Sequence, residues 1–435
     1  MSVVTLLLTV TEIMTDPPLW LAPLTSTLLG HYEKLGKAGK PGPGQWTVLA
    51  AIALVKSDQT RLISFATGTK CLGGEVRKSI SVVGSALNDS HAEVVARRGL
   101  LLWLVEQVKK EGGELLERIE GTECTWRLRS GWKLVLLTTH PPCGDATISP
   151  LSDIGEEGGE PCAKRAKLGE DFQRTGGKVA QEGESDPGGD GKDYHRLGLL
   201  RTKPGRGPRT SSLSCSDKML KWNILGLQGA PLSHLFPEPL FLSYFVLCQK
   251  PLHKHTLSRA LWQRAGTLAN QPELLYCPLV WDHSKKDGLQ ACPDTLAWVA
   301  SGDTTKPTIE VLTGGFKQGW AKKKLNNPKA WSRFSRRWLS SSVAMHITQK
   351  FPTYDALKTS SPQYRRRRAL VGSILDLWPL KPLEDFPIAD ISGNTLCDTT
   401  NALTSEKNPS IPKSSSCSSS SSLHNKESIK SHAVG

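Results

Sequence analysis

One long segment of helical periodicity, flanked by apolar and β-branched runs, most constrains the fold of this chain. Residues 91–110 carry apolar side chains at helical spacing and are followed by a Gly-Gly pair, which is typical of a helix C-terminus. Residues 46–55 and 61–69 are short apolar runs separated by a polar turn, which predicts a β-hairpin. Residues 132–140 and 239–248 predict two further strands. Strands that alternate with helices in this way predict an α/β fold.

The composition of the chain changes sharply in two places. Residues 151–191 are rich in Gly, Glu, Asp and Lys and contain few large apolar side chains, so they cannot bury enough surface to fold. Residues 389–435 include a long serine run and lack a core for the same reason. We therefore predict a folded domain over residues 28–388 with a disordered insertion inside it. Residues 1–27 and the serine-rich tail are predicted to be disordered.

The overall chemistry of the chain favours an intracellular protein with a polyanionic partner. No segment approaches the ~18 consecutive apolar residues of a membrane span, and we expect no membrane contact. The apolar N-terminus lacks the basic start and cleavage site of a secretory signal, so the ten cysteines are expected to stay reduced. A net charge of +14 favours nucleic acid as a partner, although a generic solvated surface is the alternative.

His91-Ala92-Glu93, at the start of the expected helix, is the local motif with the most chemical content. Ser90 and Glu93 have the spacing of a capping box, in which each side chain satisfies a free backbone amide. A His-x-Glu pair at a helix N-terminus is also the first half of the zinc deaminase signature. In that signature the histidine binds the metal and the glutamate moves protons. The two interpretations are compatible.

The second half of that signature needs a cysteine after a strand, and Pro142-Cys143 supplies it. The usual second cysteine would stand at position 146, which is Ala146, and this argues against a cytidine deaminase. A third protein ligand must therefore come from elsewhere. Cys215 is the best candidate, because it opens an expected helix whose free amides stabilise a thiolate. The remaining cysteines in strands or loops are expected to be small buried hydrophobes, namely Cys71, Cys124, Cys248, Cys277 and Cys292.

Five segments together resemble the adenosine-to-inosine RNA deaminase family. They are ATGTKC, LNDSHAEVVARR, PCGDA, LRTKPGRG and SCSDKMLKWNILGLQGA, in this order along the chain. The resemblance implies a cytidine-deaminase-like three-layer fold, with a mixed sheet, helices on both faces and an extended C-terminal part. It also implies a hydrolase with one zinc ion held by His91, Cys143 and Cys215, in which Glu93 donates and accepts protons.

The resemblance also carries expectations about the substrate. The short segment between Lys203 and Cys215 and the large insertion look more like the tRNA-specific members than the double-stranded RNA editing enzymes. The segment before residue 28 is also shorter than the ~50 residues of a small domain, so no double-stranded RNA-binding domain is expected there. The implied substrate is the adenosine 3′ to the anticodon, nucleotide 37, of alanine tRNA. Editing of double-stranded or messenger RNA is the alternative within the family, and an inactive RNA-binding protein is the alternative outside it.

The resemblance further implies a buried inositol hexakisphosphate. Many cations from distant segments could not share one interior without a polyanion, because an unpaired buried charge is costly. The alternative is that these cations lie on solvated faces or contact RNA phosphates. The residues that match the family's ligands for this cofactor are Asn88, Arg97, Arg98, Lys218, Lys221, Trp222, Gln228, Arg336, Tyr354, Lys358, Tyr364, Arg368 and Trp378.

A few further positions match the family or a known signal. Asp89 and Lys203 resemble residues that relay hydrogen bonds between the zinc site and the polyphosphate, although Lys203 could equally be an exposed lysine in a Pro-Gly loop. Thr69 and Lys70 match positions that contact the flipped nucleotide. The basic segment Lys164–Lys167 resembles a nuclear import signal, so the protein is expected in the nucleus, the cytoplasm or both. Nothing in the sequence indicates an obligate protein partner.

Overall fold

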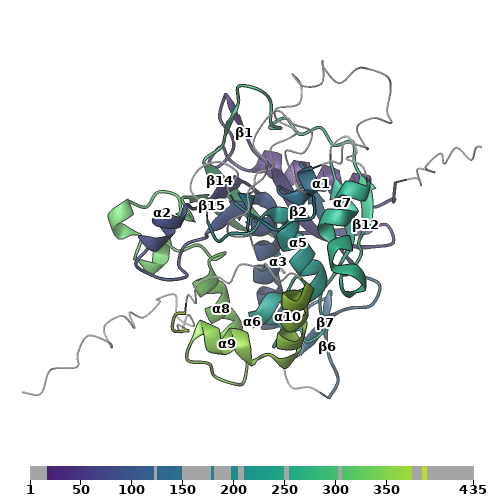
Figure 1. The fold of residues 1–435 in the computed structure, drawn as a ribbon, viewed down its shortest axis with the longest axis vertical. Helices are drawn as coiled ribbons and strands as arrows, with labels where there is room; N and C mark the ends of the chain where they lie inside the picture. Colours follow the sequence, from purple (N-terminus) through teal and green to yellow (C-terminus); the bar gives the residue numbers. More distant parts are fainter. Residues whose placement is uncertain are drawn as a thin grey trace, which may run out of the picture. The chain divides into compact units, whose positions relative to one another are not determined.

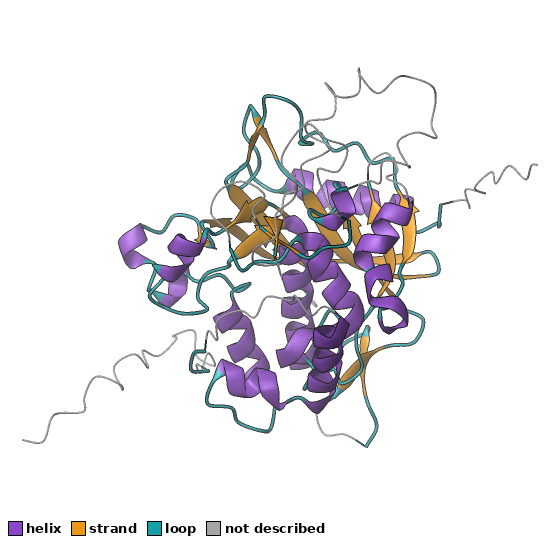
Figure 2. Ribbon diagram, viewed as in Figure 1, coloured by secondary structure: helices purple, strands orange, loops and turns teal. Residues whose placement is uncertain are grey.

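A mixed eight-stranded sheet forms the centre of the protein (Figure 1; Figure 2). The computed structural model describes residues 17–121, 125–148, 178–180, 197–203, 210–248, 254–301, 306–374 and 385–388. The chain divides into two units at residue 396, and every described residue belongs to the first. The sheet strands are β2 (Leu49–Lys56), β3 (Gln59–Thr67), β8 (Lys133–Thr138), β11 (Leu242–Leu247), β12 (Glu273–Tyr276), β14 (Asp294–Val299), β15 (Thr308–Thr313) and β16 (Phe316–Lys317).

The strand order is β12-β11-β8-β2-β3-β14-β15-β16. β12, β11 and β8 are parallel to one another, whereas all the other neighbours pair antiparallel. The predicted hairpin is the β2–β3 pair. Short two-stranded ladders lie outside this sheet and involve β1 (Gln45–Trp46), β4 (Thr69–Cys71), β5 (Asp89–His91), β6 (Leu116–Arg118), β7 (Trp126–Leu128), β9 (Lys178–Val179), β10 (Arg201–Thr202) and β13 (Gln290–Ala291).

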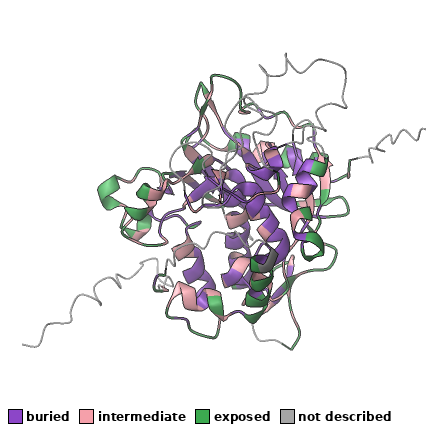
Figure 3. Ribbon diagram, in the orientation of Figure 1, coloured by how far each residue is buried: buried purple, intermediate pink, exposed green. Residues whose placement is uncertain are grey.

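Helices cover both faces of the sheet, and the alternation of side chains along the strands explains why. In β2, Ile52 and Leu54 join the core beneath α3 (Ala92–Lys109), whereas Ala51 and Val55 join the core beneath α1 (Leu21–Lys34). Successive strand residues point to opposite faces, so a continuous apolar run is buried only when both faces are covered. Figure 3 shows this buried centre. The predicted three-layer α/β fold is therefore confirmed.

The remaining helices lie mainly on the α3 side of the sheet. α5 packs against α7, and the C-terminal helices α8, α9 and α10 pack against α3, α5 and α6. These C-terminal helices form the extended C-terminal part that was predicted. The elements are α2 (Gly74–Lys78), α5 (Cys215–Leu225), α6 (Gly229–Leu232), α7 (Lys254–Leu261), α8 (Arg336–Ala344), α9 (Tyr354–Ser360) and α10 (Pro362–Ile374), with 3-10 turns η1 (Asp145–Thr147), η3 (Gln263–Leu268), η4 (Lys322–Lys324) and η5 (Pro328–Ala330).

Two predicted boundaries differ from the structure. α1 begins at Leu21 and buries Leu24 and Leu28 against the sheet, so the folded body extends N-terminal to residue 28. The predicted insertion contains β9, which pairs with β10 because Val179 buries its side chain there. The rest of the insertion and the predicted tail lie outside the described residues. Among the described helices, none combines the length and the apolar composition that crossing a membrane requires.

Candidate active site

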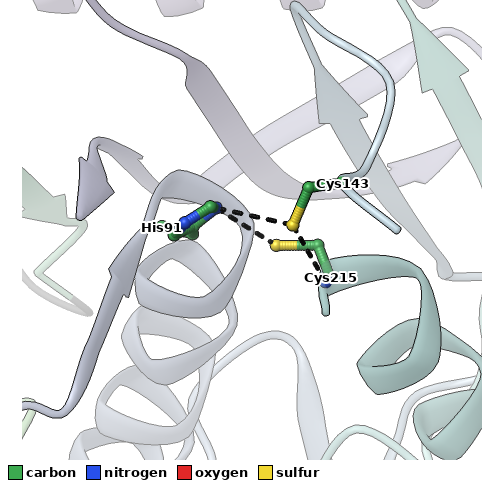
Figure 4. Close-up of side chains that lie close together, drawn as sticks. All are labelled: His91, Cys143 and Cys215. Carbon is green, nitrogen blue, oxygen red and sulfur yellow. Dashed lines mark hydrogen bonds between the residues drawn. The ribbon is translucent and has the colours of Figure 1, made fainter. Parts of the chain in front are cut away.

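The structure brings together His91, Cys143 and Cys215, three residues that are far apart in the sequence (Figure 4). Their ligand atoms all lie within 4.8 Å of one another. The Nδ1 atom of His91 lies 3.9 Å from the Cys143 sulfur and 3.5 Å from the Cys215 sulfur. A tetrahedral zinc ion, with Zn–S bonds of about 2.3 Å and Zn–N bonds of about 2.0 Å, would place its ligand atoms about 3.5–3.8 Å apart. The three donors therefore fit zinc.

Two of the three ligands lie at the start of a helix, and the third lies in a turn between two elements. His91 is the N-cap residue of α3, and Cys143 lies in the turn between β8 and η1. Cys215 is the first residue of α5, whose N-cap Ser214 accepts a hydrogen bond from the backbone of Asp217. The free backbone N–H of Cys215 points at the Cys143 sulfur over 3.4 Å. The amide at the start of α5 thus stabilises charge on the neighbouring thiol, Cys143, as well as opening the helix that carries Cys215.

The two thiols differ in how readily they ionise. A hydrogen bond with Cys215 holds the pKa of Cys143 well below its usual value, and the nearby Lys203 lowers it further. Burial raises the pKa of the Cys215 thiol. Thiolates are the metal-binding form of cysteine, so a cation bound here would hold both thiols in that form.

Glu93 lies two residues after the histidine ligand, in the first turn of α3. Its side chain is buried, with 3% of the residue exposed, and its Oε2 atom has no hydrogen-bond partner among the residues that the structure describes. Burial raises the pKa of this carboxyl, and the nearby His91 opposes the shift. An unsatisfied buried polar atom is costly and is typically explained by a bound group or a catalytic role.

The capping box predicted for Ser90 and Glu93 is not formed. Ser90 belongs to β5, which pairs with β4, and His91 is the N-cap residue without a side-chain cap. The first amide of α3, that of Ala92, instead donates to the carbonyl of Gly68. The helix start is therefore satisfied by the backbone of the turn before β4 and not by the Glu93 side chain.

A buried group of charges surrounds Asp89 and Lys203, next to the metal donors. The Lys203 ammonium donates to both carboxylate oxygens of Asp89, over 3.0 and 2.8 Å, and to the Cys215 sulfur over 3.1 Å. Lys218 also forms an ion pair with Asp89. Ser212 donates to the same carboxylate over 3.2 Å, and sequence reasoning missed it because it belongs to none of the motifs. Lys203 is therefore a buried residue and not an exposed loop lysine.

This arrangement holds its charges in the ionised state. Burial alone would neutralise both Asp89 and Lys203, but Asp89 raises the pKa of Lys203 well above its usual value. In the same way burial opposes ionisation of Asp89, while Lys203 and then Lys218 hold its pKa well below the usual range. The result is a charged connection from the Cys215 sulfur to Lys218, which lines a neighbouring cavity.

That cavity has a volume of about 390 Å³ and lies between α3, α5 and the C-terminal helices. Its lining includes seven basic side chains and two acidic ones, Asp89 and Asp355. All the described residues that were predicted to bind a polyphosphate line it, whereas Trp378 lies outside the described part of the chain. The lining residues in question are Asn88, Arg97, Arg98, Lys218, Lys221, Trp222, Gln228, Arg336, Tyr354, Lys358, Tyr364 and Arg368.

Burial lowers the pKa values of several cations in this cavity, and neighbouring cations add to the effect at Lys221 and Arg98. Burial, then Arg368 and Arg97, lower the pKa of Lys221 to about 7. Burial also lowers the pKa of Arg97 to about 10 and that of Arg98 to about 9. The Arg97 guanidinium stacks on the Trp222 ring, and its Nε atom has no hydrogen-bond partner within the described structure. The lining therefore carries positive charge that a bound polyanion would compensate.

Thr69 and Lys70, the predicted substrate contacts, lie beside the metal donors in β4. Thr69 pairs directly with His91 in the β4–β5 ladder, and Lys70 pairs with Ser90. The Thr69 hydroxyl is buried and has no hydrogen-bond partner in the part of the chain that is described. Lys70 is exposed. Both residues are thus close enough to the metal donors to meet a substrate there.

The other residues singled out from the sequence lie elsewhere. Cys248, Cys277 and Cys292 are buried, as predicted, and Cys71 is partly buried. Cys124 and the basic segment Lys164–Lys167 lie outside the described residues.

Comparisons with known proteins agree with the geometry. Residues 64–382 match the family described as the adenosine-deaminase (editase) domain. The tRNA-specific adenosine deaminase 1 of Mus musculus is 29% identical, over 77% of this chain and 92% of that protein. The protein of the same name from Drosophila melanogaster is 34% identical, over 69% of this chain and 76% of that protein. The double-stranded RNA-specific editase Adar of Drosophila melanogaster is 31% identical, over 61% of this chain but 40% of that protein.

Proposed function

This chain belongs to the adenosine-deaminase (editase) domain family, and from that premise we propose that it converts adenosine to inosine in transfer RNA. The proposal rests on one observation: the donors of His91, Cys143 and Cys215 lie within 4.8 Å of one another, and the charges of His91 and Cys143 act on the buried carboxyl of Glu93. The reaction consumes one water and releases one ammonia. An inactive RNA-binding protein would be expected to lack one of these four residues.

The relatives favour transfer RNA over other RNA substrates. The alignment spans 92% of the mouse tRNA-specific deaminase and 40% of the Drosophila double-stranded RNA editase. The similarity to the tRNA enzyme therefore extends over nearly its whole length. Inosine formation at nucleotide 37 of alanine tRNA is the specific reaction that we propose, since an unpaired loop adenosine can leave its stack at low cost.

The three donors are proposed to hold one zinc ion. Such an ion supplies a Lewis acid that activates water for addition to C6 of the base. His91 and the two cysteines would supply three protein ligands, the number that catalytic zinc sites usually have. Lys203 holds positive charge beside the Cys215 sulfur and so favours its thiolate form.

Glu93 is proposed to move the protons of the reaction. It takes a proton from the attacking water and delivers it to N1 of adenine as the hydroxyl adds to C6. It then takes the remaining proton of that hydroxyl and delivers it to the amino group, which leaves as ammonia while the C6 carbonyl forms. Its burial suits this task, because a carboxyl with a raised pKa can both accept and donate a proton near neutral pH. Its Oε2 atom, which has no hydrogen-bond partner among the described residues, is available to the substrate.

The adenine must be flipped out of its stack to reach these residues. Thr69, whose buried hydroxyl lies next to His91 in the sheet ladder, is proposed to contact the flipped nucleotide. Lys70, the next residue, is exposed and is proposed to contact a phosphate.

The basic cavity is proposed to hold one inositol hexakisphosphate as a structural cofactor. Support comes from the lining, in which seven cations face two carboxylates and Lys221 has its pKa lowered to about 7. A molecule with many phosphates would satisfy these donors together and return the lysine to its charged form. Asp89 and Lys203 would then connect this cofactor with Cys215 through the contacts described above.

The function is tested by incubating the purified protein with total tRNA and with a double-stranded RNA. Nuclease digestion and mass spectrometry then measure inosine in each substrate. We expect inosine in tRNA, and an alanine tRNA with guanosine at position 37 should lose it. Inosine in the double-stranded RNA alone would favour the editing alternative, and no inosine in either would contradict the proposal.

A further inference from the structure

Two buried aspartates occupy equivalent positions next to the two cysteine ligands. Asp145 follows Cys143 by two residues, and Asp217 follows Cys215 by two residues. Neither aspartate side chain has any exposed surface. Buried carboxylates need compensating charges, so the residues that supply them also constrain the chain segments that carry the ligands.

One arginine, Arg264 in η3, contacts both of these carboxylates. Its Nη2 atom donates a hydrogen bond to Asp217 Oδ1 over 2.8 Å, and its Nε atom lies 3.9 Å from Asp145 Oδ2. Its Nη1 atom donates to the carbonyls of Gly198 and Leu199 over 3.1 and 3.3 Å. The side chain is 7% exposed, so the guanidinium is held inside the protein.

A second arginine, Arg259 in α7, contacts Asp145 but no atom of Asp217 in the described contacts, so it can be compared with Arg264. Its Nε atom donates to Asp145 Oδ2 over 3.1 Å. Its Nη2 atom donates to the carbonyls of Asp145 and Ile148 over 3.1 and 2.6 Å. All of these acceptors belong to the segment that follows Cys143. Arg259 therefore holds one ligand segment, whereas Arg264 connects the two.

The two ligand segments also lie very close to each other. The backbone N–H of Ser216 donates to the carbonyl of Cys143 over 3.0 Å. Gly144 has a φ of +105°, and a Cβ atom there would lie 2.2 Å from the Ser214 hydroxyl. Because the backbones approach this closely, a small shift of one segment against the other changes the separation of the two sulfur atoms directly.

We propose that Arg264 is a positioning residue that sets the separation of the Cys143 and Cys215 sulfur atoms at the metal centre. The inference rests on the zinc site proposed above. The rigid guanidinium of Arg264 hydrogen-bonds to Asp217 while its charge lies 3.9 Å from Asp145 Oδ2. Arginine suits this role because its donors have fixed directions, which the point charge of lysine does not provide. Loss of such supporting contacts typically weakens metal binding by about 10–100-fold.

The test compares zinc-loaded wild-type protein with the Arg264→Lys and Arg259→Lys variants. Excess EDTA is added, and the zinc that remains on the protein is measured over time after desalting. We expect Arg264→Lys to lose zinc about 10–100-fold faster than wild type, and Arg259→Lys to show a smaller increase, because Arg259 contacts only the Cys143 segment. Cobalt-substituted protein gives a second readout, since the visible absorption of a cobalt–thiolate site depends on ligand geometry. The bands should shift more in Arg264→Lys than in Arg259→Lys.

Native zinc release and native cobalt bands in Arg264→Lys would overturn the proposal. Equal changes in both variants would also overturn it, because the cause would then be general packing and not the bridge between the segments. If Arg264→Lys is insoluble, Arg264→Gln provides the same comparison, since it keeps a polar side chain but removes the positive charge next to Asp145 and Asp217. Wild-type protein that binds no zinc would instead contradict the proposed function itself, so the two failures are distinguishable.

Discussion

The Lys203 ammonium donates a hydrogen bond to the Cys215 sulfur over 3.1 Å, in an interior where Lys203 is only 1% exposed. The same ammonium contacts both oxygens of Asp89, which also pairs with Lys218 at the wall of the basic cavity. A lysine between a thiol and a carboxylate compensates the charge of both. Through this lysine, the charge state of the proposed metal centre and that of the cavity depend on each other.

Replacement of Lys203 by methionine should therefore destabilise the protein. The change leaves Asp89 buried with one cation fewer, and breaking one side of a buried ion pair costs about 3–5 kcal/mol. Urea unfolding measures the difference in the free energy of unfolding. The control Lys70→Met removes an exposed lysine and should change stability by less than about 0.5 kcal/mol. A Lys203→Met protein as stable as wild type would show that the buried contact is unimportant.

Cys215→Ala should abolish both zinc binding and deamination. The substitution removes one of three protein donors, and a site with two protein ligands holds zinc poorly. Metal content is measured by mass spectrometry of the desalted protein, beside inosine formation in tRNA. Cys248→Ala is the matched control, because Cys248 is a buried cysteine outside the metal donors. Stoichiometric zinc in Cys215→Ala would mean that the ligand assignment is wrong.

Glu93→Gln should keep its zinc but lose turnover. Proton transfer by a positioned side chain contributes about 10²–10⁴-fold, and the amide cannot perform it. The variant should be at least as stable as wild type, since Glu93 forms no capping box and its buried carboxylate has an unpartnered oxygen in the described structure. Single-turnover rates and thermal unfolding test both statements. An active enzyme with a lowered melting temperature would instead assign Glu93 a structural role.

The lowered pKa of Lys221 predicts that the free energy of unfolding of the protein without its polyanion changes with pH. Its pKa falls from 10.5 to about 7 in the folded state, mainly through burial. Between these two pH values the unfolded chain binds a proton that the folded protein lacks, so stability rises with pH, by about 1.4 kcal/mol per unit for one proton. Below pH 7 both states are protonated and the destabilisation is fully present.

Urea unfolding at pH 7 and pH 9 measures this effect, and Lys221→Met isolates it. The wild-type protein stripped of polyanion should gain more stability between these values than the variant does. Added inositol hexakisphosphate should remove the difference, since a nearby anion keeps the lysine charged throughout. Identical pH profiles for wild type and Lys221→Met would refute the assignment.

Acid unfolding of the purified protein should release about one inositol polyphosphate per chain, as the proposed cofactor requires. Expression in cells unable to make this molecule should give little soluble enzyme, because binding to the folded state alone offsets the repulsion in the cavity. Arg98→Ala and Lys218→Ala should likewise lower soluble yield more than RNA affinity. Arg366→Ala, which removes an exposed arginine of α10, is the control.

The alternative, in which these cations contact RNA and not a polyphosphate, predicts different measurements. If Arg98 and Lys218 contacted RNA at the surface, their variants would fold normally and bind RNA less tightly. The salt dependence of binding would then fall by roughly one unit of slope for each lost phosphate contact. Well-folded protein without bound polyphosphate would overturn the cofactor assignment.

Local patterns in the sequence were enough to predict the main elements and the donors of the site. The hairpin of β2 and β3, the helix α3 and the strand β8 depend on periodicity over neighbouring residues, and the structure confirms them. The grouping of His91, Cys143 and Cys215 was also predictable, because their short motifs resemble one family. The prediction that the folded body starts at residue 28 was wrong. The helix α1 begins before that residue and packs on the sheet face opposite α3, and this sheet forms only from strands that are distant in the sequence.

Tertiary structure alone decided which polar groups are buried and what they contact. Ser90 and Glu93 have the spacing of a capping box, yet pairing of β5 with β4 and the Gly68 carbonyl satisfy the helix start instead. Lys203 and an exposed loop lysine look alike in the sequence, and only the fold puts Lys203 against Asp89. Arg264 carries no local signal at all. Side-chain type and spacing define local structure and metal donors, whereas burial and charge compensation depend on contacts between residues that are far apart in the chain.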